Sequence, residues 1–462
     1  MSTSPAADNT NTGRWAASSK LKRQRKRKLE QSLVPGWGTY DLNFNTFNNP
    51  GAESLRSFIR KLDQTARWAN TRSQYTENVR VESPRSALDL ITALCEDPSK
   101  VVEDVITIDG DEDLTRRLKM QFSRPLLFQS TATRSISHPK VSWDTFWAFM
   151  EKSREKSVDV YDYSIDEEDK RTERRLVGNV IKHWEKDSRT ALNCLDIENR
   201  IGECCPTPIM ESDLIQRIEI DSQTTIGKTD STWDNPHNEF LLLSTRDCIS
   251  PIHVDIGAAL TWLYVLHGRK IVYFPSTINL TAVRLLALLG SEQFNGYDDG
   301  WIRVELRPGD LFIMPPSCPH AVFTPDDSLV VGGHFYTSAH LPSTLEGLSL
   351  LEEKQGISNE SLGDSHYKTL TKIFSSYDKV ATPEEVKRAW ATCDLFLGSP
   401  TKPRPTTSRP TTTRPTTTRP TTTRPTTTRP TTTRPTTSRA EFINSLEDFN
   451  KRAAESFSQE PE

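Results

Sequence analysis

The chain has 462 residues, a formal net charge of −4 at pH 7 and a hydrophobic content of 35%, so a single compact domain over the whole length is not expected. No run of about 18 apolar residues occurs, and residues 1–19 contain no hydrophobic signal core, which argues against a membrane span and against secretion. The seven cysteines have no repeated pair spacing and indicate reduced thiols inside a cell.

Two basic segments flank an acidic body. Residues 1–28 carry eight Lys/Arg and one aspartate, and residues 402–439 carry nine Lys/Arg and no acid. We expect residues 1–50 to be a disordered basic arm, whose cluster at 20–28 is typical of a nuclear import signal or of a contact with chromatin or nucleic acid; a merely solvated charge run is the alternative. The acidic body suits a basic ligand, although soluble domains are often acidic without one.

Toward the C-terminus the pentad Arg-Pro-Thr-Thr-Thr recurs between Arg404 and Arg439. Its prolines fix the backbone and its threonines and arginines supply no core, so the repeat predicts an extended linker over 399–439. The tail that follows, 440–462, has apolar residues at mostly helical spacing and is compatible with a short docking helix.

Helical patterns dominate the first half of the body, for example at 141–152, and predict a helical and mixed supporting region over 51–185. Short β-branched or aromatic runs separated by turn residues then predict an antiparallel barrel or sandwich within 186–345, interrupted by one helix after Asn279. A C-terminal helical region is expected over 346–398. The predicted strands are 239–243, 260–266, 270–274, 302–306, 310–314, 320–323 and 328–331.

The segment Ser250-Pro-Ile-His-Val-Asp255 carries a candidate metal-binding pair. Residues two apart in an extended chain project to one face, so His253 and Asp255 converge. One imidazole and one carboxylate suit Fe(II) when a second imidazole joins them, which leaves three coordination positions open. The pair alone is a weak signal because it arises often by chance.

A second histidine strengthens the assignment. His320 follows a Pro-Gly-Asp turn, an apolar strand and a proline-rich bend, and in a closed barrel it can reach back to the pair. His267, His334 and His340 compete with it, and His334 is the serious rival because it follows two glycines at a strand end.

Lys270 begins an apolar strand 17 residues after His253. A lysine that points into a barrel is costly unless it meets an anion, so a dicarboxylate cosubstrate is a reasonable partner. A lysine whose charge reaches the rim of the barrel is the alternative.

These features resemble the JmjC domain of Fe(II)- and 2-oxoglutarate-dependent dioxygenases, and within it the histone lysine demethylase branch with PHD-finger and F-box-linked members. The similarity lies over 239–345, with weaker similarity upstream at 124–129, 158–162 and 192–195. The resemblance implies a double-stranded β-helix, a cupin-like jelly roll of the α+β or mainly β class, with helical N- and C-terminal extensions and disordered tails.

Carried over to this chain, the resemblance implies that His253, Asp255 and His320 bind Fe(II). Lys270 would pair with the distal carboxylate of 2-oxoglutarate, Ser250 would add a hydrogen bond, and Asn193 would lie near the carboxylate that chelates the metal. O₂ would be the oxidant. The implied activity is demethylation of N-methyl-lysine on a histone tail or another basic protein, in the nucleus and without a membrane partner.

Two positions depart from the branch. Leu263 follows the barrel tryptophan where a tyrosine is common, so that one cosubstrate hydrogen bond is absent or comes from Tyr264, and His334 stands where asparagine is usual. Two alternatives therefore stay open: a JmjC hydroxylase acting on a non-histone protein, and a catalytically silent JmjC scaffold that binds chromatin.

Overall fold

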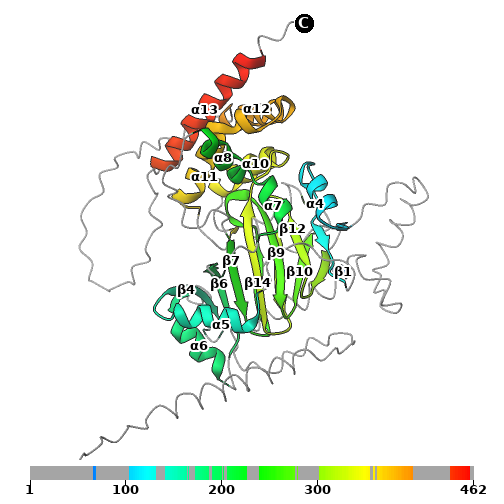
Figure 1. Ribbon diagram of the computed structural model, residues 1–462, viewed down its shortest axis with the longest axis vertical. Helices are drawn as coiled ribbons and strands as arrows, with labels where there is room; N and C mark the ends of the chain where they lie inside the picture. Colours follow the sequence, from blue (N-terminus) through cyan, green and yellow to red (C-terminus); the bar gives the residue numbers. More distant parts are fainter. Residues whose placement is uncertain are drawn as a thin grey trace, which may run out of the picture.

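The computed structural model describes residues 66–68, 104–131, 141–163, 165, 172–186, 190–199, 201, 205–225, 239–275, 278, 301–353, 357–358, 362–398 and 437–457. Two β-sheets form the centre of this part of the chain (Figure 1). One sheet has the order β1 (Ala66–Trp68), β11 (Trp301–Leu306), β10 (Lys270–Pro275), β13 (His320–Thr324) and β8 (Cys248–His253). The other has the order β2 (Ile106–Thr107), β3 (Leu126–Phe128), β12 (Leu311–Met314), β9 (Leu260–His267), β14 (Ser328–Phe335), β7 (Glu239–Ser244), β6 (Leu192–Glu198), β4 (Ser157–Asp162) and β5 (Thr172–Leu176).

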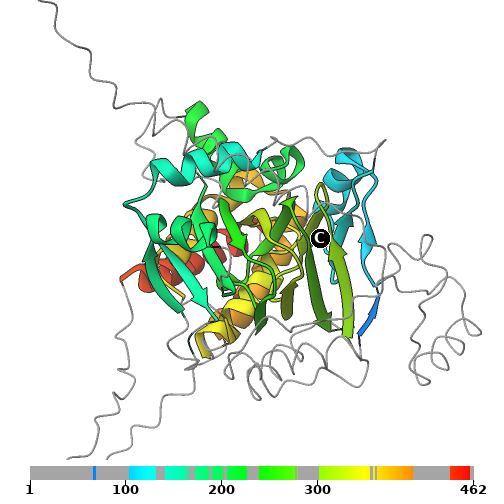
Figure 2. The same ribbon diagram turned by 90° about the horizontal axis from the view of Figure 1, so that it is seen from below.

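Four antiparallel strands from each sheet make the jelly roll: β7, β14, β9 and β12 face β8, β13, β10 and β11. The predicted double-stranded β-helix is thereby confirmed. Strands from the N-terminal half extend both sheets: β2 and β3 join the larger sheet beside β12, and β1, drawn in blue at the edge of the sandwich in Figure 2, pairs with β11.

Strand β8 is the jelly-roll strand that the sequence pattern did not predict. Pro251 interrupts its hydrophobic pattern, and a proline inside a strand argues against a strand. The structure accommodates it at an irregularity, where His320 pairs with His253 but Val322 pairs with Ser250. The extra residue on β8 is the pattern of a β-bulge, which bends a strand and re-aims its side chains.

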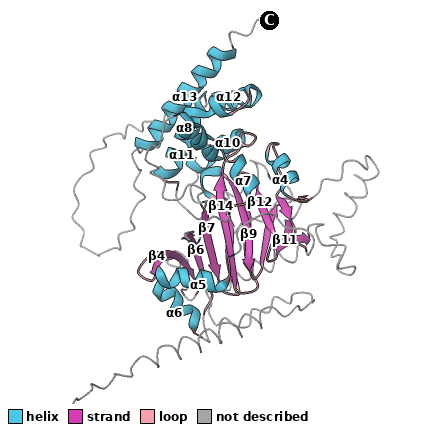
Figure 3. Cartoon of the chain, viewed as in Figure 1, coloured by secondary structure: helices cyan, strands magenta, loops and turns pink. Residues whose placement is uncertain are grey.

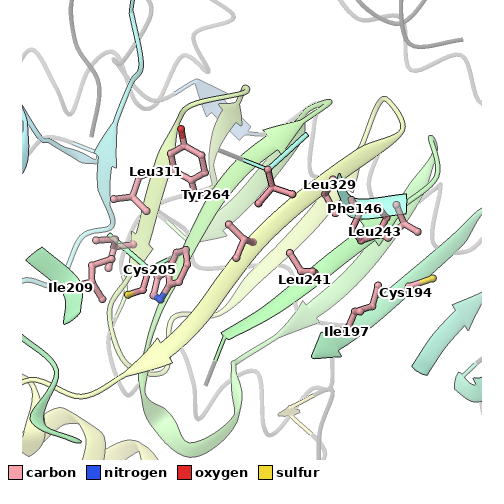
Figure 4. Close-up of a cluster of buried hydrophobic side chains, with 14 of the residues drawn as sticks. Phe146, Cys194, Ile197, Cys205, Ile209, Leu241, Leu243, Tyr264, Leu311 and Leu329 are labelled. Carbon is pink, nitrogen blue, oxygen red and sulfur yellow. The ribbon is translucent and has the colours of Figure 1, made fainter. Parts of the chain in front are cut away.

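Alternating side chains divide between the interior of the sandwich and its outer faces. The interior cluster joins the two sheets through apolar residues, including Leu263, Val272, Val304, Phe312 and Val330. The outer face of the larger sheet carries a second cluster (Figure 4), which is covered by helices. Those helices are α4 (Asp111–Leu118), α5 (Trp143–Lys152), α6 (Val177–Glu185) and α7 (Thr207–Ser212).

A bundle of helices lies beyond one end of the sandwich (Figures 1 and 3). It contains α8 (Leu214–Thr225), α10 (Leu341–Glu353), α11 (Asp364–Val380), α12 (Pro383–Gly398) and α13 (Thr437–Phe457), which share one buried apolar cluster. The segment expected to hold a short docking helix thus forms a helix of 21 residues that packs on α11 and α12. Bidentate hydrogen bonds from Arg439 to Glu352 and from Arg452 to Asp378 tie α13 to its neighbours.

Several predicted features lie outside the described residues: the basic arm, the Arg-Pro-Thr repeat up to residue 436 and the helix after Asn279. Within the described part of the chain, no helix combines the length and the apolar character that a membrane crossing requires.

Candidate metal centre

His253, Asp255 and His320 lie together at one end of the sandwich interior. His253 is the last residue of β8, His320 is the first of β13, and the two are directly paired across the strands. Asp255 follows in an extended conformation and precedes the short 3₁₀ helix η3 (Ile256–Ala258). One ligand atom from each side chain lies within 4.8 Å of the other two, a spacing that one ion can bridge.

Backbone carbonyls fix both imidazole rings. Nδ1 of His253 donates to the carbonyl oxygen of Pro251 at 2.8 Å, and Nδ1 of His320 donates to that of Cys318 at 3.0 Å. Each bond assigns the proton to Nδ1 and leaves the lone pair of Nε2 for a ligand. The two Nε2 atoms lie 3.7 Å and 3.8 Å from the same Oδ1 of Asp255.

The electrostatics suit a cation at this position. Burial, reinforced by His320, lowers the pKa of His253 to about 4, so its ring is a neutral donor at pH 7. Burial alone would raise the pKa of Asp255, but the histidines around it outweigh burial and lower it. Two imidazoles and one carboxylate are the donor set that suits Fe(II) with open positions, so these residues fit the metal.

Lys270 lies in the same interior, buried to 5% exposure. Its Nζ donates to Ser244 Oγ at 2.7 Å and to Thr324 Oγ1 at 2.8 Å, and no carboxylate pairs with it in the described part of the chain. Burial lowers its pKa to about 8. A buried ammonium held by two neutral hydroxyls is a candidate site for an anion.

A chain of hydrogen bonds runs on from this lysine. Ser244 Oγ donates to Asn193 Oδ1 at 2.6 Å, and Asn193 Nδ2 lies 3.5 Å from Ser250 Oγ. The structure therefore brings Asn193 and Ser250 together with Lys270 in one polar network. The sequence pattern did not indicate Ser244 and Thr324, and single hydroxyl residues on strands carry no signal that could have found them.

The competing histidines make other contacts. His267 stacks on Trp143 and donates to the carbonyl oxygen of Val141, and His340 accepts from the backbone N–H of Phe122. His334 lies on the interior side of β14, hydrogen-bonded to Thr261 at 3.0 Å, and is not one of the three clustered ligands.

Tyr264 does not stand in for the tyrosine that is common after the barrel tryptophan. Leu263 belongs to the interior cluster, whereas Tyr264 points to the opposite face and packs near Leu311 in the outer cluster (Figure 4). The adjacent residue of a strand necessarily projects to the other side, so Tyr264 cannot supply the missing interior hydroxyl.

Fold and site together define a class of protein: a double-stranded β-helix with two histidines and one carboxylate at one end of its interior. The chain is related to JmjC histone demethylases. It is 30% identical over 147 residues to JmjC domain-containing histone demethylation protein 1 from Candida albicans. The matched region covers 29% of this chain and 29% of that protein. It is 33% identical over 117 residues to lysine-specific demethylase 2A from Xenopus tropicalis, covering 24% of this chain and 10% of that protein. A JmjC domain-containing histone demethylation protein 1 from Caenorhabditis elegans is 29% identical over 169 residues, covering 34% and 16%.

The chain spans less than a third of the length of each of these relatives. No protein-family model matches it.

Proposed function

We propose that the protein is an Fe(II)- and 2-oxoglutarate-dependent dioxygenase that demethylates N-methyl-lysine on histone tails. The observation that carries the proposal is the pairing of two sites inside one jelly roll: three convergent metal-ligand atoms and a buried lysine without a carboxylate partner in the described chain. The relationship to proteins named histone demethylases supports the same chemistry.

In this proposal His253, Asp255 and His320 hold the iron. The backbone bonds at both Nδ1 atoms keep the Nε2 lone pairs aimed at it, so the ligands need little reorganisation when the metal binds. When bound, iron with 2-oxoglutarate and O₂ supplies the oxidation of an N-methyl C–H bond, which leads to loss of the carbon as formaldehyde.

Lys270 binds the distal carboxylate of 2-oxoglutarate. Its ammonium is held in place by Ser244 and Thr324, and a dicarboxylate would neutralise a buried charge that has no carboxylate partner among the described residues. Asn193 and Ser250 continue the hydrogen-bonded chain from this ammonium, and Ser250 lies on β8, the strand that ends at His253, so they orient the middle of the cosubstrate. The apolar interior cluster next to them excludes water from the site.

We infer the substrate and the compartment from the charge of the chain and from its similarity to proteins named histone demethylases. An acidic body attracts a basic tail, and the basic segment 20–28 would bring the protein to the nucleus and to chromatin. The nuclear location is tested by fluorescence microscopy of a fusion protein with residues 20–28 deleted. A nuclear signal that persists in the deletion would contradict the role given to this segment.

The activity is tested by mass spectrometry of methylated histone peptides incubated aerobically with the purified protein, Fe(II), ascorbate and 2-oxoglutarate. Loss of a methyl mass that disappears in His253→Ala is the expected result. Gain of one oxygen would establish a hydroxylase instead. No peptide change and no succinate, in a protein that binds neither iron nor 2-oxoglutarate, would establish the silent scaffold.

A further inference from the structure

Strand β8 carries Ser250 and His253 of the candidate site, yet it lies at the edge of its sheet. Its only strand partner in the described part of the chain is β13, and that pairing is irregular around Pro251. A proline has no N–H to donate to a ladder, and an edge strand leaves one row of backbone groups without a strand partner. The position of β8 therefore depends on contacts from outside the sheet.

The free edge of β8 meets the side chain of Tyr163, which follows β4. The backbone N–H of Ile249 donates to the Tyr163 hydroxyl at 2.7 Å, and this hydroxyl donates to the carbonyl oxygen of the same Ile249. One side chain thus takes the place of a neighbouring strand, because it satisfies both backbone groups of this residue. Tyr163 is almost fully buried, its N–H donates to the carbonyl oxygen of Ala191 at 3.2 Å, and its ring lies 4.8 Å from that of Tyr161. A well-packed ring therefore presents the hydroxyl to β8.

A second contact holds the chain just past the end of β8. The N–H of Val254, which lies between two of the candidate metal ligands, donates to the carbonyl oxygen of Ile357 at 2.9 Å. Val254 also forms a parallel bridge with the residue after Ile357, in the segment between α10 and α11. Tyr163, Val254 and Ile357 belong to one buried apolar cluster with Ile249. The stretch of β8 between the two contacts is thus anchored at both ends.

That stretch carries the geometry of the site. Pro251 lies two residues after Ile249, and its carbonyl oxygen accepts from Nδ1 of His253 at 2.8 Å, the bond that aims Nε2 at the metal. Ser250 lies between Ile249 and Pro251, and its hydroxyl is the one next to Asn193. A displacement of β8 at Ile249 would therefore move the group that orients an imidazole and a candidate cosubstrate contact together.

We infer that Tyr163 is a positioning residue for the candidate metal centre: its hydroxyl fixes β8 at Ile249, and the strand then places the Pro251 carbonyl that orients His253. The inference rests on the proposed function, since it takes His253 to be a metal ligand. Tyr163 acts through the backbone of β8 and not through a contact with the metal or the cosubstrate. Groups that orient metal ligands commonly change metal affinity by roughly ten- to a hundredfold when removed, and a residue one step further from the metal belongs at the lower end.

The chain contains a matched control in the helical bundle. Tyr367 of α11 is also buried, and its hydroxyl donates to Glu352 Oε1 of α10 at 2.9 Å. A change of either tyrosine to phenylalanine removes one buried, hydrogen-bonded hydroxyl and keeps the ring. An effect on metal binding that appears only at Tyr163 therefore does not come from a general loss of stability.

The test is a titration of the full chain with Co(II) under anaerobic conditions, followed by visible absorption, beside thermal unfolding and hydrogen–deuterium exchange of the metal-free protein. We expect Tyr163→Phe to weaken Co(II) binding about tenfold, to change the absorption spectrum and to speed exchange at the Ile249 amide. Tyr367→Phe should lower the melting temperature with unchanged Co(II) affinity and spectrum. Tyr161→Leu removes the ring that packs on Tyr163 but keeps the Tyr163 hydroxyl, so it should weaken Co(II) binding by a smaller factor.

Wild-type affinity and spectrum in Tyr163→Phe, or an equal loss of affinity in Tyr367→Phe, would overturn the positioning role while leaving the proposed function intact. If Tyr163→Phe does not fold, wild-type affinity in Tyr161→Leu overturns it in the same way. A wild-type protein that binds neither Co(II) nor Fe(II) would overturn the proposed function itself, and this inference with it.

Discussion

The Nζ atom of Lys270 lies 2.8 Å from Thr324 Oγ1, and this hydrogen bond ties the buried ammonium to the strand that begins with His320. The candidate anion site and the candidate metal centre are therefore built on one strand, four residues apart. A rigid strand sets the spacing between the two ends of a ligand that spans both sites.

Loss of the ammonium should separate cosubstrate binding from metal binding. We expect Lys270→Ala to raise the KM for 2-oxoglutarate by about a hundredfold, because the charge-assisted hydrogen bond to the carboxylate is lost. Thr324→Val should raise it by about tenfold, because the ammonium is then held less firmly. Iron content, measured by elemental analysis, should stay normal. Thr324→Ser keeps the acceptor and should behave like the wild type; an unchanged KM in Lys270→Ala would remove Lys270 from the site.

The affinity for 2-oxoglutarate should fall at alkaline pH. Burial lowers the pKa of Lys270 to about 8, so the free protein loses the ammonium as the pH rises through this value, and a carboxylate then has no cation to meet. Calorimetric titration with 2-oxoglutarate, without O₂, should show a constant affinity below about pH 7.5 and a decline that approaches about tenfold per pH unit above about pH 8.5. Lys270→Arg keeps its charge over this range, so its profile should be flat even if its affinity is lower.

Much of this site could be predicted because short motifs carry it. The spacing of His253 and Asp255 and the turn before His320 are local features, and so is the start of a strand at Lys270. Ser244 and Thr324 could not be predicted, because their contacts with Lys270 depend on which strands pair and in which register, and a local sequence pattern encodes neither. Strand β8 was not predicted because Pro251 is a local signal against a strand. The irregular pairing of β8 with β13 accommodates this proline, and that pairing is not visible in the sequence.

Gly347 of α10 should be needed for the geometry of both ligand-bearing loops. A Cβ added there would collide with Ser317 Oγ, before His320, and lie 2.8 Å from the Cβ of Ala258, after Asp255. Both neighbours already have left-handed backbone, with φ of 57° at Ser317 and 49° at Ala258, so neither loop can shift freely. We expect Gly347→Ala to lower the free energy of unfolding by roughly 1–3 kcal/mol in urea denaturation.

Ser317→Gly provides the matched rescue for this change. It removes the colliding hydroxyl and suits the positive φ, so the double variant Gly347→Ala/Ser317→Gly should recover most of the lost stability. Equal stability of the double variant and Gly347→Ala would mean that the collision with Ser317 is not the cause.

Asp213 should make the protein less stable as the pH rises from acid to neutral. Burial raises its pKa from the ordinary 3.8 to about 7, although Oδ1 accepts from the backbone N–H of Tyr336. A carboxyl whose pKa is raised on folding contributes stability that is complete below about pH 4 and is lost as the pH rises through about 7. Thermal unfolding of Asp213→Asn, which keeps the acceptor oxygen, should therefore show a flatter pH dependence between these values and a higher melting temperature at pH 8. Asp378→Asn, in an exposed ion pair with Arg452, is the control and should keep the wild-type slope.

The stability of the C-terminal bundle should depend on α13 and hardly at all on the length of the repeat before it. Phe442 and Phe449 are fully buried against α11, so Phe449→Ala should lower the free energy of unfolding by roughly 3–5 kcal/mol. Deleting one pentad of the repeat should change it by less than about 0.5 kcal/mol, because the entropy of closing a loop depends only on the logarithm of its length. Both variants are compared with the wild type by urea denaturation. A large loss of unfolding free energy on shortening the repeat would show that the repeat itself packs on the bundle. A small loss in Phe449→Ala would show that α13 contributes little to the fold.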